Sequence, residues 1–580
     1  MKKEAGTISK LILFTLLVFF IQIFLFRDIL LYYYPTDDEF ALLVHSTTVS
    51  GHLDPAEWFT IGFAKYFTVY PEWTPYYQNI FRPVVNVVYY FNSLIFTDNY
   101  GFYLLFSYLL NGIAFALVYY IARRMLELSE NFSIVAAILF LFNPGLLGKF
   151  YFFPSFAYDL FAAVTAGIVL ILMFKREYIP ALVIASLGMF LKETMMFLPI
   201  ALFLTYFIIQ KNERNEVNKI LAYSYLLLPY LLWVAIRLSF GYEFQGASYT
   251  NHLTNPKFFG ITLIQSILSW PLGIPDKVDV IVNFKSLISL NFEQINLFYL
   301  LSSCINLFLN SLIAIYAVKF FRKKLYRDMS TWFLVILTWL FIYYIMVIVL
   351  GLETRFGETF YLLAIPLVLC LSISSIGLIT KYSSYLFIGI IFFYGFAGYI
   401  NILGGDTIEL RKINYKHSRE LMKLLKENGN VSGDILLVND VTSGFGFESL
   451  REFSGVRKKI TKINSLSFND VTKRSVTGFD ISVSRISDTA YIKITLPEGT
   501  DFQFEGIDQT EFEHPENQWF KRNDGLFYRF PNESTTGESK STGAMTYDLG
   551  NELEIKYLSL GVHAIVYFNP SSGKYEMTLL

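Results

Sequence analysis

Long apolar runs constrain the fold of this chain more than any other feature. The first 402 residues hold about eleven of them. A run of roughly 20 apolar residues crosses the hydrocarbon core of a bilayer, and somewhat shorter runs can do so when interfacial residues flank them. Charged residues are 16% of the chain, against about 25% in ordinary globular domains. The sequence therefore predicts a polytopic α-helical membrane protein. The runs lie near residues 11–31, 102–122, 133–150, 155–174, 178–191, 195–209, 220–239, 297–318, 330–350, 360–379 and 383–402.

The distribution of charge divides the chain into two predicted domains. Residues 1–402 hold 49 of the Asp, Glu, Lys and Arg residues, and the much shorter segment 403–580 holds 46. We expect a transmembrane domain over 1–402, with large external loops at 32–101 and 241–296, and a soluble domain over 403–580.

Basic loops predict the orientation, because Lys and Arg are retained on the cytoplasmic side. Alternate connections carry 16 of the 26 basic residues that precede Leu403. They are Lys2, Lys3, Lys10, Arg123, Arg124, Lys175, Arg176, Lys211, Arg214, Lys219, the cluster Lys319 to Arg327, and Lys381. We expect a multi-pass protein of the cell membrane, with a cytoplasmic N-terminus and an extracytoplasmic C-terminal domain. An even number of spans would reverse the side of that domain.

The C-terminal segment has the pattern of a small β-rich α/β or α+β domain. An amphipathic helix is predicted over about 407–428, followed by strand-like runs. The runs lie at 435–439, 481–486, 491–496, 554–560, 563–568 and 575–580, and a hairpin turn is predicted at 569–573.

Composition also excludes some classes of function. A net charge of −1 gives no general basic surface, so nucleic acid is not an expected partner. The two cysteines, Cys304 and Cys370, each lie in an apolar run, which argues against a disulfide framework and a Cys-rich metal site.

The strongest candidate for chemistry is an acidic triplet, Asp37, Asp38 and Glu39, directly after the first apolar run. Adjacent carboxylates repel one another, so some of their pKa values are expected to be raised, and such an acid can act as a general base. A solvated acidic loop, or a cation site without turnover, is the alternative interpretation.

Several further motifs follow the acidic pair along the chain. They are Phe81-Arg82-Pro83, Asp98 to Leu104, Asn143-Pro144, Tyr158 to Phe161, Lys192-Glu193-Thr194 with Pro199, and Glu353 to Tyr361 with Pro366. Together with Asp37-Asp38, these motifs resemble the GT-C superfamily of polytopic glycosyltransferases, in particular the protein O-mannosyltransferase branch, in which an acidic pair just after the first span is typical. The resemblance covers about residues 8–210, with a weaker match near Arg355, and the C-terminal segment departs from it.

The resemblance implies inverting transfer of a sugar from a polyprenyl-phosphate donor to a hydroxyl of a glycan, lipid or protein acceptor of the cell envelope. Asp37 would be the base, and Asp38 would orient the acceptor or hold a cation. Glu39 would substitute if the acidic pair were Asp38 and Glu39.

External cations are candidates for binding the lipid phosphate, because negative charge grows on it as it leaves. They are Arg82, Lys192 and Arg355. Each has a plain structural alternative: Arg82 could reach toward lipid headgroups, Lys192 could pair with Glu193, and Arg355 lies between Glu353 and Glu358.

Further candidates are weaker. Asp159 lies near the end of an apolar run, where an ionisable group is costly and therefore a functional candidate, although a hydrogen bond to Tyr or Asn would also satisfy it. Glu193, Glu358 and His45 complete this group. A divalent cation remains open, since His45 and His52 with Asp38 could bind Zn²⁺, but their spacing is not a zinc motif.

Two rival functions remain open from the sequence. A transporter or flippase of polyprenyl-linked lipids would be expected to show inverted repeats and interrupted helices. A noncatalytic envelope assembly protein would keep the membrane fold without the chemistry.

Overall fold

The structure is a computed structural model of the full chain, and it is described over the following residues. They are 2–33, 82–96, 99–143, 153–213, 218–239, 268, 285–289, 297–322, 329–349, 360–375, 389, 393, 407–428, 434–438, 460–462, 467–468, 480–486, 489–495, 502–506, 520–521, 526–529, 537–539, 545–548, 552–558, 562–569 and 574–579.

The chain forms two compact units. The first contains Met1–Leu31 and Val49–Ile408, and the second contains Tyr32–Thr48 and Glu409–Leu580. The predicted boundary between residues 402 and 403 lies outside the described residues.

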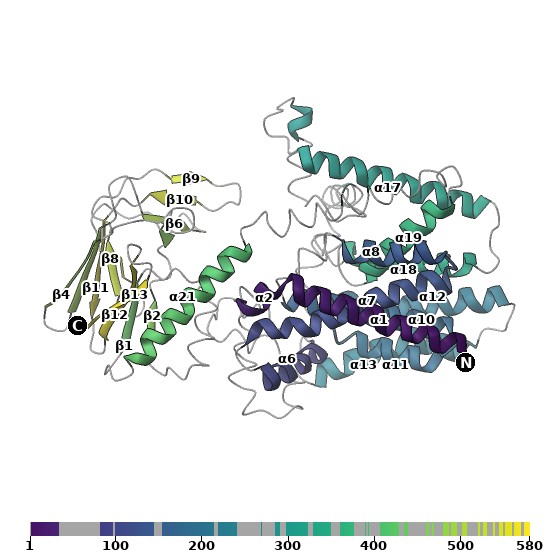
Figure 1. Ribbon diagram of the computed structural model, residues 1–580, viewed down its shortest axis with the longest axis horizontal. Coiled ribbons are helices and arrows are strands. Elements are labelled where there is room, and N and C mark those ends of the chain that lie inside the picture. Colours follow the sequence, from purple (N-terminus) through teal and green to yellow (C-terminus); the bar gives the residue numbers. More distant parts are fainter. Residues whose placement is uncertain are drawn as a thin grey trace. The chain divides into compact units, whose positions relative to one another are not determined.

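Helices build the described part of the first unit (Figure 1). The helices are α1 (Lys2–Leu25), α2 (Arg27–Leu31), α6 (Pro83–Phe96), α7 (Leu104–Tyr120), α8 (Glu130–Leu141), α10 (Phe153–Phe174), α11 (Tyr178–Gly188), α12 (Phe197–Glu213), α13 (Lys219–Ser239), α17 (Leu297–Arg322), α18 (Met329–Val349) and α19 (Phe360–Ser375). Helices cover most of nine of the first ten apolar runs, the first of them by α1 and α2 together. The helix α8 covers the first half of the run 133–150, whose residues 144–150 lie outside the described residues, as does almost all of the eleventh run, 383–402.

Four helical segments in the described part of the chain are long and apolar enough to cross a membrane. They are Thr7–Leu25, Gly101–Met125, Thr194–Lys211 and Lys219–Ser239. Shorter apolar helices include Tyr158–Phe174 and Phe360–Ser374. These helices suggest membrane association and agree with a helical membrane protein, while the count of eleven spans and the orientation stay predictions.

The helix α19 is surrounded by other helices. Its residues are buried almost all round, which is typical of a helix that is apolar on every side. The ring of Phe360 packs with Phe197 and Trp339, and Trp339 Nε1 donates a hydrogen bond of 2.6 Å to Thr205 Oγ1. This aromatic cluster joins α12, α18 and α19 into the core of the first unit.

Small and polar residues join α1 to α7. A Cβ atom on Gly112 would lie 2.5 Å from the Thr15 carbonyl oxygen, so the two backbones approach as closely as glycine allows. Asn111, the residue before Gly112, donates a buried hydrogen bond of 2.8 Å from Nδ2 to Gln22 Oε1 of α1. Small residues and side-chain hydrogen bonds are the usual means by which helices associate in lipid.

The first unit has two ends that differ in their charged residues. At one end, Lys10 Nζ lies 2.8 Å from Glu130 Oε1, and Arg124 donates to Thr7 Oγ1 at 2.8 Å. Contacts from Tyr178 to Gln210 and Tyr225 bring the adjoining ends of α11, α12 and α13 together. We call this the basic end, and its members are Lys10, Arg124, Lys175, Arg176, Lys211 and Lys219.

The opposite end holds the predicted site residues that the structure describes. The rings of Phe106, in the first turn of α7, and Phe161, in the third turn of α10, are 5.9 Å apart there. The close approach of Gly101 to Leu30 places α2 at this end also. We call it the Lys192 end.

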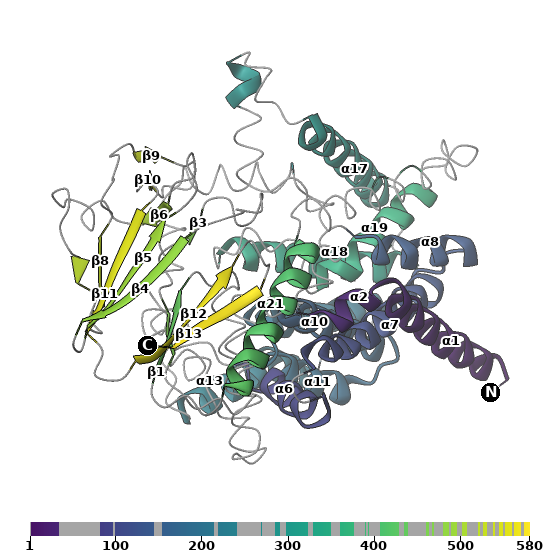
Figure 2. The same ribbon diagram turned by 60° about the vertical axis from the view of Figure 1, so that its left-hand side comes forward.

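The described part of the second unit consists of one helix and three sheets. The helix α21 (Thr407–Glu427) lies beside the mixed sheet β13-β12-β1-β2, where the His417 ring contacts Tyr575 (Figure 2). Strands β1 (Asp434–Val438), β2 (Ile460–Lys462), β12 (Val562–Asn569) and β13 (Lys574–Leu579) form this sheet, with β1 parallel to β2 and β12. Leu421 and Leu425 of α21 are buried, as the amphipathic pattern requires.

Two antiparallel sheets complete the described strands. One has the order β3-β6-β10-β9 and the other β4-β5-β11-β8-β7. Their strands are β3 (Ser467–Phe468), β4 (Asp480–Ile486), β5 (Thr489–Thr495), β6 (Phe502–Gly506), β7 (Phe520–Lys521), β8 (Leu526–Arg529), β9 (Gly537–Ser539), β10 (Met545–Asp548) and β11 (Glu552–Leu558).

Strands lie at all six runs that the sequence indicated, and β12 and β13 pair from Asn569 and Lys574 across the expected turn. The sequence pattern did not identify β2, β3 or β6 to β10. Several of these strands have only two to four residues, which is too short for a recognisable alternation.

The contact between α1 and α7 predicts the effect of adding volume at Gly112. Gly112→Val should lower the free energy of unfolding by about 1–3 kcal/mol, because the new side chain forces the helices apart. Reversible denaturation of the purified protein in detergent measures the change. Leu109→Val is the matched control, since Leu109 is 39% exposed on the same helix and should change stability by under about 0.5 kcal/mol. Equal losses in the two variants would contradict this account.

Candidate functional site

The predicted catalytic acids lie outside the described residues. This holds for Asp37, Asp38 and Glu39, and likewise for His45, Arg355 and Glu358. Glu193 begins the short helix η5 (Glu193–Met196), but its side chain is not among those described. The described candidates are therefore Arg82, Asp159 and Lys192.

A buried ion pair joins Lys192 to Asp159. Lys192 Nζ lies 2.5 Å from Asp159 Oδ1, and the two side chains are only 4% and 1% exposed. Asp159 lies in the second turn of α10, whereas Lys192 has extended backbone geometry between α11 and η5. The sequence suggested Glu193, or a neutral Tyr or Asn, as partners for these groups, and it did not suggest that they pair with each other.

Arg82 lies beside the same turn of α10. Its guanidinium carbon is 5.3 Å from the centroid of the Tyr158 ring, a cation–π distance. Arg82 immediately precedes α6, whose first residue is Pro83, and its carbonyl oxygen accepts a hydrogen bond from Val85 N. Because Tyr158 and Asp159 are consecutive, the structure brings two of the predicted cations, Arg82 and Lys192, to one turn of one helix.

A third cation, Arg237, lies in the last turn of α13. Its side chain is only 5% exposed, and its guanidinium carbon lies 5.0 Å from the centroid of a Trp233 ring. Trp233 packs with Met189 and Phe190 in a buried cluster, which Val84 of α6 also contacts. This cluster links the regions that carry Arg82, Lys192 and Arg237.

The tyrosine Tyr230 fixes the segment that follows Lys192. Its hydroxyl donates a hydrogen bond to the Met196 carbonyl oxygen, which ties α13 to η5. Thr194 lies between Lys192 and Met196, and its side chain is 1% exposed. Within the described part of the chain, the Thr194 hydroxyl has no hydrogen-bond partner.

Arg237 was not identified from the sequence. It is one of the ten basic residues before Leu403 that lie outside the basic loops, and none of the motifs includes it. The sequence nevertheless contains a feature that could have identified it. Arg237 lies in the last turn of an apolar helix, one turn after Trp233, and an ionisable group at membrane depth is a functional candidate.

The described residues at the Lys192 end bring together three cations, Arg82, Lys192 and Arg237, and one carboxylate, Asp159. Where water is excluded, cations attract an anion more strongly than in bulk solvent. Arginine holds a phosphate through two parallel hydrogen bonds, whereas Lys192 has already committed its charge to Asp159. The arrangement suits anion binding by the two arginines, near a lysine that the ion pair with Asp159 holds in position.

The described residues contain no group of three or more His, Cys, Asp or Glu side chains that could hold a metal ion. The divalent cation considered with Asp38 and His45 falls outside the described part of the chain.

No protein-family model matches this chain, and no curated protein sequence matches it. The resemblance to GT-C glycosyltransferases therefore rests on the motifs alone.

The ion pair predicts a characteristic pattern of stability. Lys192→Met should lower the free energy of unfolding by about 3–5 kcal/mol, because it removes the cation that compensates a buried carboxylate. Asp159→Leu should lower the free energy of unfolding by a similar amount, because it leaves the buried ammonium of Lys192 without its carboxylate. The double variant, Asp159→Leu with Lys192→Met, should recover most of the loss, because neither charge remains.

Denaturation of the four proteins in detergent gives the coupling energy between the two positions. If the double variant lost as much unfolding free energy as the two single variants added together, the two charges would not stabilise each other.

Proposed function

We propose that this chain is an integral-membrane glycosyltransferase of the GT-C type. It moves a sugar from a polyprenyl-phosphate donor to a hydroxyl of a cell-envelope glycan, lipid or protein acceptor at the outer membrane face, with inversion at the anomeric carbon. The observation that carries the proposal is the position of Arg82 beside the Asp159–Lys192 pair, at the helix ends opposite the basic end.

The course of the chain supports a link between these cations and the acidic triplet. The helix α2 ends at Leu31 at the Lys192 end, and Asp37 follows only six residues later. Six extended residues span at most about 20 Å. In sequence, the triplet therefore follows closely on the helix end that lies at the Lys192 end.

Charge along the helices supports an active site on the outer side. The basic end holds several of the cations that the positive-inside rule assigns to the cytoplasm, so the Lys192 end would face the exterior. A donor with a polyprenyl tail reaches such a site from the plane of the bilayer.

In the proposed reaction, Asp37 takes the proton from the acceptor hydroxyl while the hydroxyl oxygen attacks the sugar carbon. The bond from that carbon to the phosphate oxygen breaks, and the lipid phosphate leaves with the bonding electrons. Arg82 and Arg355 bind the departing phosphate, and the geometry adds Arg237 to them. Asp38 orients the acceptor or holds a cation, and Glu39 is the substitute acid.

Lys192 and Asp159 have a different role in this proposal from the one that the motifs suggested for Lys192. A lysine whose charge is compensated at 2.5 Å by a buried carboxylate adds little net charge for a phosphate. The pair instead fixes the turn that carries Tyr158, on which Arg82 lies. Glu193, Glu358 and His45 remain secondary candidates without an assigned step.

The catalytic test is release of bare polyprenyl phosphate. The purified protein is incubated with a panel of polyprenyl-phosphate sugars and an envelope fraction as acceptor. Asp37→Asn should lower the rate by at least about 10²–10⁴-fold, the usual contribution of a general base. Asp28→Asn is the control, because Asp28 is an exposed acid of α2 at the same end, and it should leave the rate unchanged.

Retained activity in both Asp37→Asn and Asp38→Asn would contradict the proposed base. Movement of the intact donor across a vesicle membrane, without release of lipid phosphate, would instead identify a transporter.

The phosphate-binding test is a comparison at Arg82. Arg82→Gln should reduce kcat/KM by about 10²–10³-fold, as loss of a donor to developing negative charge usually does. Arg82→Lys should recover only part of this, because lysine cannot make the paired hydrogen bonds of arginine. Lys285→Gln is the control for lost positive charge, since Lys285 is an exposed lysine outside this cluster. Equal activity in Arg82→Gln and the unaltered protein would exclude Arg82 from donor binding.

A further inference from the structure

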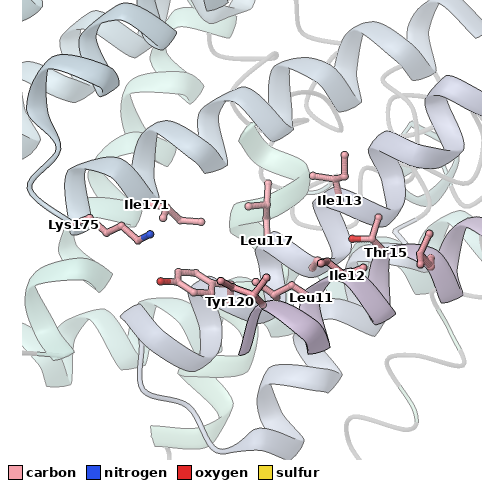
Figure 3. Close-up of a pocket in the computed structure, with 11 residues that line it drawn as sticks. Leu11, Ile12, Thr15, Ile113, Leu117, Tyr120, Ile171 and Lys175 are labelled. Atoms are coloured by element: carbon pink, nitrogen blue, oxygen red, sulfur yellow. The ribbon is translucent and has the colours of Figure 1, made fainter. Parts of the chain in front are cut away.

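A groove runs between α1 and α10 at the basic end, with α7 as its floor (Figure 3). Its volume is about 480 Å³, and its walls are almost entirely apolar. Ile8, Ile12 and Leu16 line one side, Leu117 lines the floor, and Ile171 lines the other side. This groove is separate from the candidate site, because Lys175 at its end lies sixteen residues after Asp159, or about 24 Å along a helix.

Two polar groups lie at one end of the groove. Figure 3 shows the Lys175 ammonium and the Tyr120 hydroxyl at the same end of this hollow. Lys175 is exposed, and its ammonium forms no hydrogen bond or ion pair with any residue in the described part of the chain. The groove therefore combines a hydrocarbon-like channel with a cation at its end.

The groove is open to its surroundings through α1. Ile8, Ile12 and Leu16 are 58%, 56% and 44% exposed, and within the described part of the chain α1 packs mainly on α7. In a bilayer, surfaces of this kind face lipid. The separation from Ile8 to Leu16 corresponds to about 12 Å along the helix, which suits part of a single acyl chain.

We propose that this groove is a binding site for one anionic phospholipid. Its phosphate lies against Lys175 and Tyr120, and one of its acyl chains lies along α1 and α10 over α7. Charge complementarity favours an anionic headgroup over a zwitterionic one, because a basic residue at a membrane surface attracts anionic lipid by about 1 kcal/mol. This inference does not depend on glycosyl transfer.

The next residue in the chain provides a matched control. Arg176 has a positive φ of 65°, and its side chain lines a different cavity, together with Tyr178, Pro180 and Asn218. Lys175 and Arg176 therefore carry the same charge at adjacent positions but border separate hollows. Only Lys175 should influence the lipid in the groove between α1 and α10.

The experiment places a photoreactive benzoylphenylalanine at Leu16 of the full-length protein. The protein is reconstituted into vesicles of equal parts phosphatidylglycerol and phosphatidylcholine, irradiated, and its crosslinked lipids are identified by mass spectrometry. We expect phosphatidylglycerol to exceed phosphatidylcholine about fivefold, the ratio that corresponds to one basic residue. A probe at Leu17, which is 52% exposed and does not line the groove, should report a ratio near one.

Lys175→Gln should bring the ratio at Leu16 close to one, whereas Arg176→Gln should leave it about fivefold. Equal ratios at Leu16 and Leu17 in the unaltered protein would overturn the proposal. So would a preference at Leu16 that survives Lys175→Gln, or a probe at Leu16 that crosslinks no lipid.

Discussion

The buried ion pair between Lys192 and Asp159 is the interaction on which the arrangement of the Lys192 end depends. Two charges that are at most 4% exposed are costly unless they compensate each other, so the pair fixes the distance between α10 and the segment before α12. That constraint holds Tyr158 in place beneath Arg82. The hydrogen bond from Tyr230 to Met196 then ties α13, and with it Arg237, to the same segment.

Cations gather at both ends of the first unit, but with different degrees of exposure. Lys10 and Lys175, at the basic end, are exposed, whereas Lys192 and Arg237, at the opposite end, are buried. Exposed cations at a helix end are compatible with water and lipid headgroups, and they need no special partner. Buried charges are costly in a membrane domain and therefore mark candidate functional sites, which is why the Lys192 end is the better candidate for a binding site.

The sequence predicted the helical elements well, because long apolar runs are a strong signal that does not depend on tertiary contacts. The same applies to α21, whose buried Leu421 and Leu425 follow a helical period. Pairings between distant residues could not be predicted. Asp159 and Lys192 are 33 positions apart, and nothing in their local sequences indicates that α10 and η5 meet.

Arg237 illustrates a different limit of sequence analysis. Its burial depends on Trp233, and the position of Trp233 depends on Met189, Phe190 and Val84 from two other helical regions. The sequence showed an arginine at a helix end, which is usually a residue that reaches to the membrane surface. Only the packing of α13 against these regions shows that it is directed into the protein.

The contact between α1 and α7 connects the membrane helices to the proposed chemistry. Most of α1 is exposed, and the described contacts that hold it are concentrated on α7, where Gly112 permits close approach and Asn111 binds Gln22. Under the proposed function, the acidic triplet follows α1 and α2 in sequence, and this contact surface fixes the helices from which the chain continues toward it. A helix held on one side by backbone packing and a buried hydrogen bond is rigid along its axis but open to lipid elsewhere. That combination holds the end of α1 firmly while it leaves most of the helix surface open to a lipid-linked donor.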